Sequence, residues 1–153
     1  MKILDTFNSQ ARVNTVWAYA AVGHPSPKLF DAIALKSMEK LDAFNSQAIA
    51  NMVWAYATVG HSSPELFDAI SHKAMQKLDA FNSQEIANTV WAYAAAGHSS
   101  PKLFDAISLK AMQKLDAFNS QNIANTVWAY AAVGHPSPKL FDAISHKAIE
   151  KLD

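Results

Sequence analysis

Cysteine is absent from this 153-residue chain, which excludes disulfide bonds and thiolate sites and leaves the redox compartment undetermined. An excess of either charge is missing too, because 13 lysines and arginines balance 13 aspartates and glutamates. No global field therefore draws the chain toward nucleic acid or an anionic membrane. Long apolar runs are also lacking: none approaches the roughly 20 residues that span a bilayer, so we expect no membrane insertion. The opening residues, MKILDTFNSQ, show neither an apolar signal core nor the composition of a transit peptide.

What the chain does contain is a near-identical repeat of 37 residues, marked by Trp17, Trp54, Trp91 and Trp128. A unit of this size cannot bury a core alone, so the copies must stack. We predict an all-α fold, a right-handed α-solenoid of helical hairpins in a single domain over residues 1–153. Its repeats are 6–42, 43–79, 80–116 and 117–153, and residues 1–5 align with the tail of a preceding repeat. A segment of a longer array and a consensus-style sequence both fit this pattern.

The third repeat contains the start and stop signals of two helices. Asn82 suits the N-cap of the first helix, and Glu85, three residues later, completes a capping box. Gly97 ends that helix, since glycine adopts the left-handed C′ conformation cheaply. Ser100 and Pro101 then begin a second helix, with proline in the first turn, where its missing N–H costs nothing. We expect the second helix to run to about residue 115.

Helical phase separates two faces of the first helix. The apolar face includes Ile86, Val90 and Tyr93, with Trp91 at its edge. The opposite side carries Gln84, Glu85, Asn88, Thr89, Ala92 and Ala95. Alanine permits close approach of successive first helices, whereas the bulkier second helices sit farther apart. We therefore expect a curved stack with the first helices on the concave side, and a function carried by that surface rather than by an active-site pocket.

The strings IANMVWAYATVG (49–60), IANTVWAYAAAG (86–97) and IANTVWAYAAVG (123–134) resemble the first-helix signature of octotricopeptide-type repeats. The following P-x-L-F-D-A-I segment agrees with their second helix. Such repeats occur in organellar RNA-binding proteins related to the FAST-kinase and RAP-domain families. The resemblance covers essentially the whole chain. It implies non-enzymatic binding of single-stranded RNA, one base per repeat, for RNA maturation or stabilisation in a chloroplast or mitochondrion.

Two features depart from that family. The period of 37 is closer to the heptatricopeptide variant, and Arg12 and Val13 replace the Ile-Ala of the other copies in the first repeat. No RAP-like or other catalytic domain follows, so nuclease activity is not expected.

Two rows of amide side chains run along the first helices. They are Gln10, Gln47, Gln84 and Gln121, and, four residues after each, Asn14, Asn51, Asn88 and Asn125. Residues at i and i+4 share a helix face, and each amide offers a donor and an acceptor to an unpaired base edge. We predict that these amide rows contact RNA. The alternative is a structural ladder in which the amides bond neighbouring helices or backbone.

One position beside the amide rows varies between repeats. It is alanine in the first two repeats (Ala11 and Ala48), Glu85 in the third and Asn122 in the fourth. In one-base-per-repeat proteins, variable residues on the concave helix select the base. We include this position in the predicted RNA-binding surface, and neutral drift at an exposed position is the alternative. Because the repeats are so alike, the predicted RNA target is low in sequence complexity.

Charge argues against tight RNA binding. The first helices carry only Arg12 and Glu85, whereas phosphate contacts supply most nucleic-acid affinity. Two lysines in each repeat lie toward the C-terminal end of the second helix, where they are typical partners of the helix dipole.

Histidine recurs after each capping glycine, as His24, His61, His98 and His135. Equivalent residues of stacked helices lie roughly 8–10 Å apart, too far to share a metal ion at about 2 Å. His72 and His146 follow Asp68 and Asp142 by four residues, which favours surface pairs. Because the candidate residues recur once per repeat, they do not bring a nucleophile, a base and an oxyanion donor together at one point. We therefore expect no catalytic residue, and likewise no metal and no cofactor.

The tryptophans, and the tyrosine two residues after each, are candidates for a base-stacking platform. Helical phase favours the core for both instead, because Trp91 and Tyr93 lie on the two flanks of the apolar face. We expect buried rings whose tyrosine hydroxyls reach the surface.

Three functions stay open at this stage. The first is an RNA-binding module. The second is a protein-interaction scaffold or subunit of a larger assembly, which neutral charge and an alanine-rich concave face favour. The third is a repeat array without a natural ligand. The last repeat has none of the polar substitutions of a capping repeat and the first has only Arg12 in place of isoleucine, so we also expect head-to-tail self-association.

Overall fold

The computed structural model describes residues 6–151, so the expected remnant of a preceding repeat lies outside the described residues. The described part forms eight α-helices and no strand. The first helices of the repeats, here called the A helices, are α1 (Ser9–Val22), α3 (Ser46–Val59), α5 (Ser83–Ala95) and α7 (Ser120–Val133). The second, or B, helices are α2 (Pro27–Glu39), α4 (Pro64–Lys77), α6 (Pro101–Gln113) and α8 (Pro138–Lys151). The prediction of an all-α stack of helical hairpins is confirmed.

Local capping signals set the helix boundaries of the third repeat. The Asn82 side chain accepts from the Glu85 backbone N–H at 2.8 Å, and the Glu85 carboxylate accepts from the Asn82 backbone N–H at 3.0 Å. The predicted capping box is therefore confirmed. Gly97 has a φ of 67°, the left-handed conformation expected at the end of this helix. Pro101 begins α6 as predicted, although the Ser100 side chain makes no cap bond.

A short 3-10 turn connects each of the first three B helices to the next A helix. These turns are η2 (Leu41–Ala43), η3 (Leu78–Ala80) and η4 (Leu115–Ala117). The predicted end of the third repeat's second helix is wrong by two residues, because α6 stops at Gln113. The tighter turn keeps Leu115 buried while the chain changes direction toward the next N-cap.

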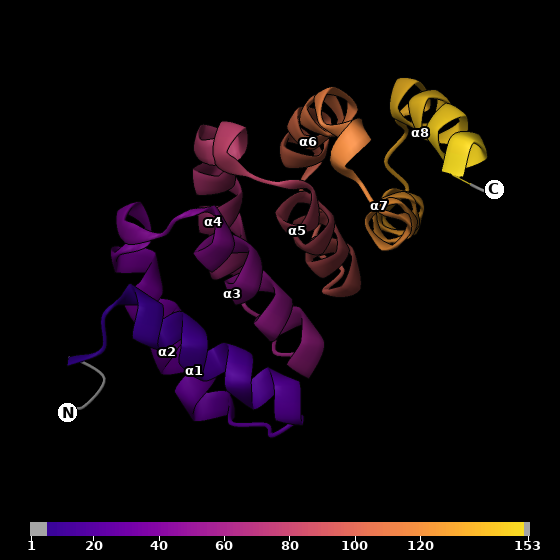
Figure 1. Ribbon diagram of the computed structural model, residues 1–153. Coiled ribbons are helices and arrows are strands. Elements are labelled where there is room, and N and C mark those ends of the chain that lie inside the picture. The colour runs from indigo at the N-terminus through magenta and orange to yellow at the C-terminus, as the bar shows by residue number, and fades with distance from the viewer. Residues whose placement is uncertain (1–5, 152–153) are drawn as a thin grey trace.

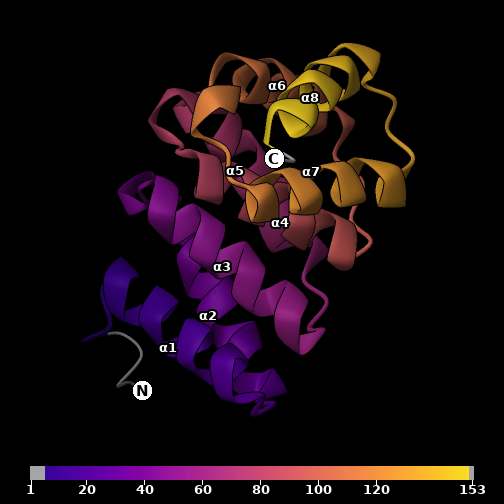
Figure 2. The same cartoon turned by 45° about the vertical axis from the view of Figure 1, so that its right-hand side comes forward.

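The A helices form the inner layer of a curved stack and the B helices form the outer layer (Figures 1 and 2). Neighbouring A helices make extensive contact, whereas neighbouring B helices touch much less. Ala55, Ala92 and Ala129 are fully buried, and their methyl groups allow the close approach of the A helices. The expected position of the A helices on the concave side agrees with this arrangement.

Two residues expected on the open side of α5 are buried instead. Ala92 and Thr89 are both 0% exposed, because neighbouring A helices cover that side. The Thr89 hydroxyl meets its hydrogen-bonding need inside the helix, donating to the Glu85 carbonyl at 2.7 Å.

Buried tyrosines tie each repeat to the one before it. The hydroxyls of Tyr56, Tyr93 and Tyr130 donate to the carbonyl oxygens of Phe30, Phe67 and Phe104 at 2.5, 2.6 and 2.6 Å. The predicted burial of these three rings is confirmed, at 0–1% exposure. The predicted surface position of their hydroxyls is wrong, because the preceding repeat covers them. Burial, which disfavours the phenolate, raises the pKa of all three phenols above its ordinary value.

Candidate nucleic-acid interface

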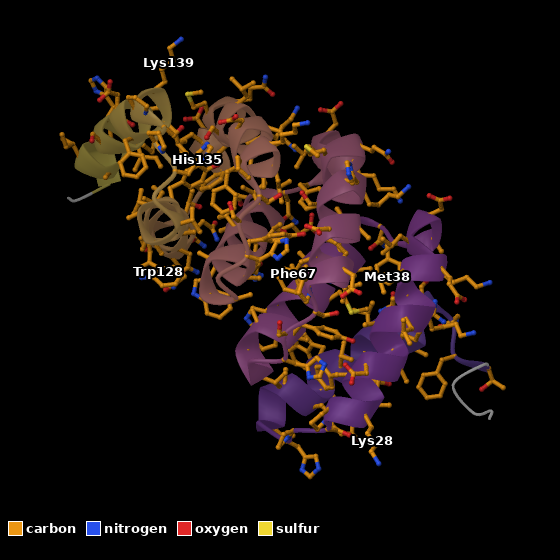
Figure 3. The ribbon with its side chains drawn as sticks, turned by 180° about the vertical axis from the view of Figure 1, so that it is seen from behind. Lys28, Met38, Phe67, Trp128, His135 and Lys139 are labelled. Atoms are coloured by element: carbon orange, nitrogen blue, oxygen red, sulfur yellow. The ribbon has the colours of Figure 1, made fainter. Side chains whose placement is uncertain are left out.

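One face of every A helix carries a Gln, an Asn and a Trp at intervals of four and three residues. Side chains at these intervals lie above one another on a helix. In α7 they are Gln121, Asn125 and Trp128, and Figure 3 shows Trp128 on the side of α7 turned away from α8. The amide rows therefore run beside a tryptophan row, which consists of Trp17, Trp54, Trp91 and Trp128.

The glutamines of the amide rows are all exposed, while the asparagines are exposed in α1 and partly buried in the other A helices. Gln10 Nε2 donates to Asn14 Oδ1 at 2.9 Å, and Gln121 Nε2 donates to Asn125 Oδ1 at 3.2 Å. Both bonds stay within one helix. Since an amide has two donor hydrogens and two acceptor lone pairs, each of these side chains keeps polar groups to offer a ligand.

The variable position beside the amide rows does not form a continuous exposed surface. Ala48 and Asn122 are only 7% and 6% exposed, and Ala11 and Glu85 are partly buried. The expectation of an exposed position is therefore wrong for Ala48 and Asn122. Glu85 and Asn122 act as capping-box partners at the starts of α5 and α7. Helix capping accounts for these two side chains without RNA.

The tryptophans are more exposed than the helical phase of the sequence predicts. Trp17 and Trp128 are 45% and 48% exposed, and Trp54 and Trp91 are partly buried. The predicted burial in the core is therefore wrong for Trp17 and Trp128, whereas Trp54 and Trp91 are partly buried and pack against the core. Residues at the edge of an apolar face are covered only if a neighbouring helix reaches them, and here the neighbours present a second indole instead.

Two of the three adjacent pairs of indoles in the tryptophan row contact one another. The rings of Trp17 and Trp54 stack with centroids 6.0 Å apart and planes at 30°. Those of Trp91 and Trp128 lie 6.5 Å apart at 33°. Two pairs of neighbouring A helices, α1 with α3 and α5 with α7, thus each supply one exposed and one partly exposed indole, and such aromatic faces can stack with flat rings.

The A helices offer this surface almost no charge. Arg12, their only basic residue, is 3% exposed and donates from Nη1 to the Phe7 carbonyl at 2.6 Å. Glu85 is held in its capping box. Any ligand of this face is therefore bound mainly by stacking and neutral hydrogen bonds.

The lysines of the B helices bind the 3-10 turns, in addition to lying near the helix ends as expected. Lys73 pairs with Asp42, Lys110 with Asp79 and Lys147 with Asp116. The hydrogen bond from each lysine, followed by its positive charge, lowers the pKa of the Asp42 and Asp79 carboxyls. Lys77 and Lys114 donate to the carbonyl oxygens of Phe44 and Phe81.

Histidines bind the aspartates of the preceding repeat. His61, His98 and His135 lie 2.7, 2.8 and 2.7 Å from carboxylate oxygens of Asp31, Asp68 and Asp105. The predicted surface pair of His72 with Asp68 is therefore wrong, since Asp68 bonds to His98 in the next repeat. Among residues 6–151, no group of three His, Cys, Asp or Glu side chains is placed to hold a metal ion. Likewise, none of the described helices is long and apolar enough to cross a bilayer.

Comparison with known proteins identifies the family. Residues 1–153 match the model of a family described as RNA-editing substrate-binding complex 6 protein. No curated protein matches the chain. Because the family match covers the whole sequence, the chain belongs to this family of helical-repeat proteins of an RNA-editing complex.

Proposed function

We propose that the concave face of this chain holds single-stranded RNA, with bases stacking on the tryptophan row and base edges bonding to the amide rows. The observation that carries the proposal is the partial exposure of the indoles, 45% at Trp17 and 48% at Trp128. Stacking of a base on an aromatic side chain contributes about 1–3 kcal/mol. Membership of an RNA-editing complex family supports RNA as the ligand.

Each repeat contributes one Gln, one Asn and one Trp, which favours a register of one base per repeat, as in octotricopeptide-like proteins. Near-identical repeats favour a target of low sequence complexity. We propose that the four repeats act as one solenoid domain without catalytic activity. Its proposed role is RNA maturation or stabilisation in the mitochondrion, where this family's complex edits RNA.

A second candidate is a protein partner in the same concave groove. The neutral A helices favour it, because the buried Arg12 leaves this face without an exposed cation among the described residues. Helical-hairpin solenoids commonly present such a groove to peptides or to other subunits.

The test is a variant with Asn51, Asn88 and Asn125 all changed to Ala. We expect weaker binding to homopolymeric single-stranded RNA with helicity retained, because partly exposed amides that bond base edges contribute to affinity. Each lost contact should cost about 1–3 kcal/mol, by analogy with bidentate base contacts. The measurements are an RNA titration and circular dichroism.

The matched control changes Gln76 and Gln113, exposed amides of the B helices, to Ala. This variant should bind RNA like the parent chain. A triple asparagine variant with lower melting temperature but unchanged affinity per folded molecule would show a structural ladder instead. Failure of the parent chain to bind RNA at low salt would contradict RNA binding and favour a protein partner.

A further inference from the structure

The joint between α3 and α5 lies inside the stack. α3 packs on α1 as well as on α5, and α5 packs on α7 as well as on α3, so described helices surround this joint on both sides (Figures 1 and 2). The tryptophan row is interrupted here. Trp17 contacts Trp54 and Trp91 contacts Trp128, but within residues 6–151 Trp54 and Trp91 share no ring contact. Each of these two indoles therefore has a ring partner on one side and none on the side of the interruption.

Amide side chains without a partner flank the interruption. In α1 and α7, the Gln and Asn side chains of the amide rows bond to each other. In the part of the chain that the structure describes, the four amides of α3 and α5 make no side-chain hydrogen bond; they are Gln47, Asn51, Gln84 and Asn88. Asn51 and Asn88 are partly buried and precede Trp54 and Trp91 by three residues, so each lies beside an indole on the same helix face. Partial burial favours a bonding partner, because an unpaired amide away from water is costly.

The surroundings of the interruption are neutral. α3 has no charged residue, and the one charged side chain of α5, Glu85, is held in its capping box. Aromatic faces and amides without a nearby cation suit a flat, uncharged ring that has donors and acceptors on its edge. A nucleobase has this chemistry, whereas a phosphate group does not.

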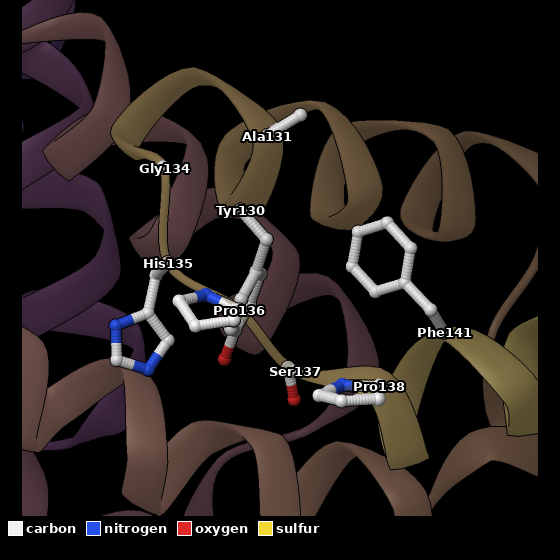
Figure 4. Close-up of a pocket in the computed structure, with 8 residues that line it drawn as sticks. All are labelled: Tyr130, Ala131, Gly134, His135, Pro136, Ser137, Pro138 and Phe141. Atoms are coloured by element: carbon white, nitrogen blue, oxygen red, sulfur yellow. The ribbon is translucent and has the colours of Figure 1, made fainter.

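The groove between the end of α7 and the start of α8 lacks these features. It has a volume of about 520 Å³, and its lining includes no Trp, Gln or Asn side chain (Figure 4). Its polar side chains, Tyr130, His135 and Ser137, already bond to the preceding repeat. The groove therefore offers no free amide to the edge of a base, and the joint between α3 and α5 is the better candidate.

We propose that one purine base inserts between Trp54 and Trp91, with an indole on each face and its edge bonded to the amides of Asn51 and Asn88. This inference rests on the proposed RNA binding and adds the place and the class of the base that the chain selects. A purine has two fused rings and covers more of both indoles than a pyrimidine does. The donor and acceptor of an amide also match N6 and N7 of adenine. Bases on either side lie on the stacked indole pairs, which accept any base.

The probes are a short labelled oligouridylate and the same oligomer with one central adenosine. Fluorescence anisotropy measures the affinity of the parent chain for each. We expect the adenosine oligomer to bind about fivefold more tightly, because one purine fills the interruption and bonds through its edge. A second adenosine beside the first should add less than about twofold, since the interruption admits one base.

Two matched variants locate the effect. The chain with Asn51→Ala and Asn88→Ala should keep no more than about a twofold preference for the adenosine oligomer, because the amides that bond the purine edge are gone. The chain with Asn14→Ala and Asn125→Ala loses as many amides of the same row and should keep the full preference, even where it binds both oligomers more weakly. Asn51 and Asn88 make no side-chain hydrogen bond in the described part of the chain, so their removal breaks none and the variant should fold. Circular dichroism checks this.

The ratio of the two affinities tests the inference, and the affinity for oligouridylate tests the proposed function. Three results would overturn the inserted purine and leave RNA binding intact. They are equal affinities for the two oligomers, an equal rise with each added adenosine, and a preference that survives in the chain with Asn51→Ala and Asn88→Ala. No binding of either oligomer at low salt would overturn both the inference and the proposed function.

Discussion

At the residue scale, two aromatic residues that are close in sequence differ in how deeply they are buried. Tyr93 is fully buried and its hydroxyl is bonded to the preceding repeat, whereas Trp91, two residues earlier, faces another indole at the concave surface. Tyrosine therefore holds the repeats together, and tryptophan remains available to a ligand. Burial requires the phenol to stay protonated, because a buried phenolate would lose its solvation and its donor hydrogen.

This requirement predicts loss of stability at alkaline pH. The folded chain raises the pKa of Tyr93, and likewise of Tyr56 and Tyr130. In the unfolded chain these phenols ionise near pH 10. Their contribution is thus fully present below about pH 10 and is lost as pH rises above it. Urea unfolding across this range should show a falling free energy of unfolding. A Tyr93→Phe chain should show a shallower fall, and an equal slope would contradict the assignment.

At the scale of the helix, alanine sets the spacing of the A helices. Ala92 is 0% exposed where α5 meets its neighbours, and Ala95, three residues later, is exposed. We expect Ala92→Leu to lower the free energy of unfolding by about 1–3 kcal/mol, because no space exists for three more carbons. Ala95→Leu should change it by less than about 0.5 kcal/mol. Chemical denaturation measures both, and equal effects would refute this account of the inner layer.

The helices and their ends could be predicted from the sequence because their signals are local. Asn82 and Glu85 are three residues apart, and the left-handed turn at Gly97 depends on that residue alone. The 37-residue period of the chain also predicts that the repeats stack. None of these predictions depends on how one repeat is placed against the next.

The errors concern contacts between repeats. Lys110 meets Asp79, 31 residues away, and the Tyr93 hydroxyl meets the Phe67 carbonyl, 26 residues away. Helical phase gives the direction of a side chain within its own helix, but the offset between repeats decides what covers it. The same offset explains why Trp91 is only partly buried and why the candidate site was predicted without the tryptophans.

At the scale of the whole molecule, the stack is a neutral scaffold with one aromatic face. Several of its charges are used between repeats, as in the pairs of Lys73 with Asp42 and His61 with Asp31. Within residues 6–151, the A helices place no exposed cation on the concave face, and exposed cations are what make nucleic-acid binding steeply salt-dependent. Stacking on the tryptophan row and hydrogen bonds from the amide rows are left to hold the ligand, which predicts RNA binding of modest affinity and shallow salt dependence.

The most direct measurement is tryptophan fluorescence during titration with homopolymeric single-stranded RNA at two salt concentrations. All four tryptophans of the chain belong to the concave row, so the signal reports only on the proposed surface. The account predicts strong quenching, a small change of affinity with salt, and weaker binding by about 1–3 kcal/mol in a Trp17→Ala chain. Unchanged fluorescence with RNA bound, or full affinity in the Trp17→Ala and Trp128→Ala chains, would contradict it.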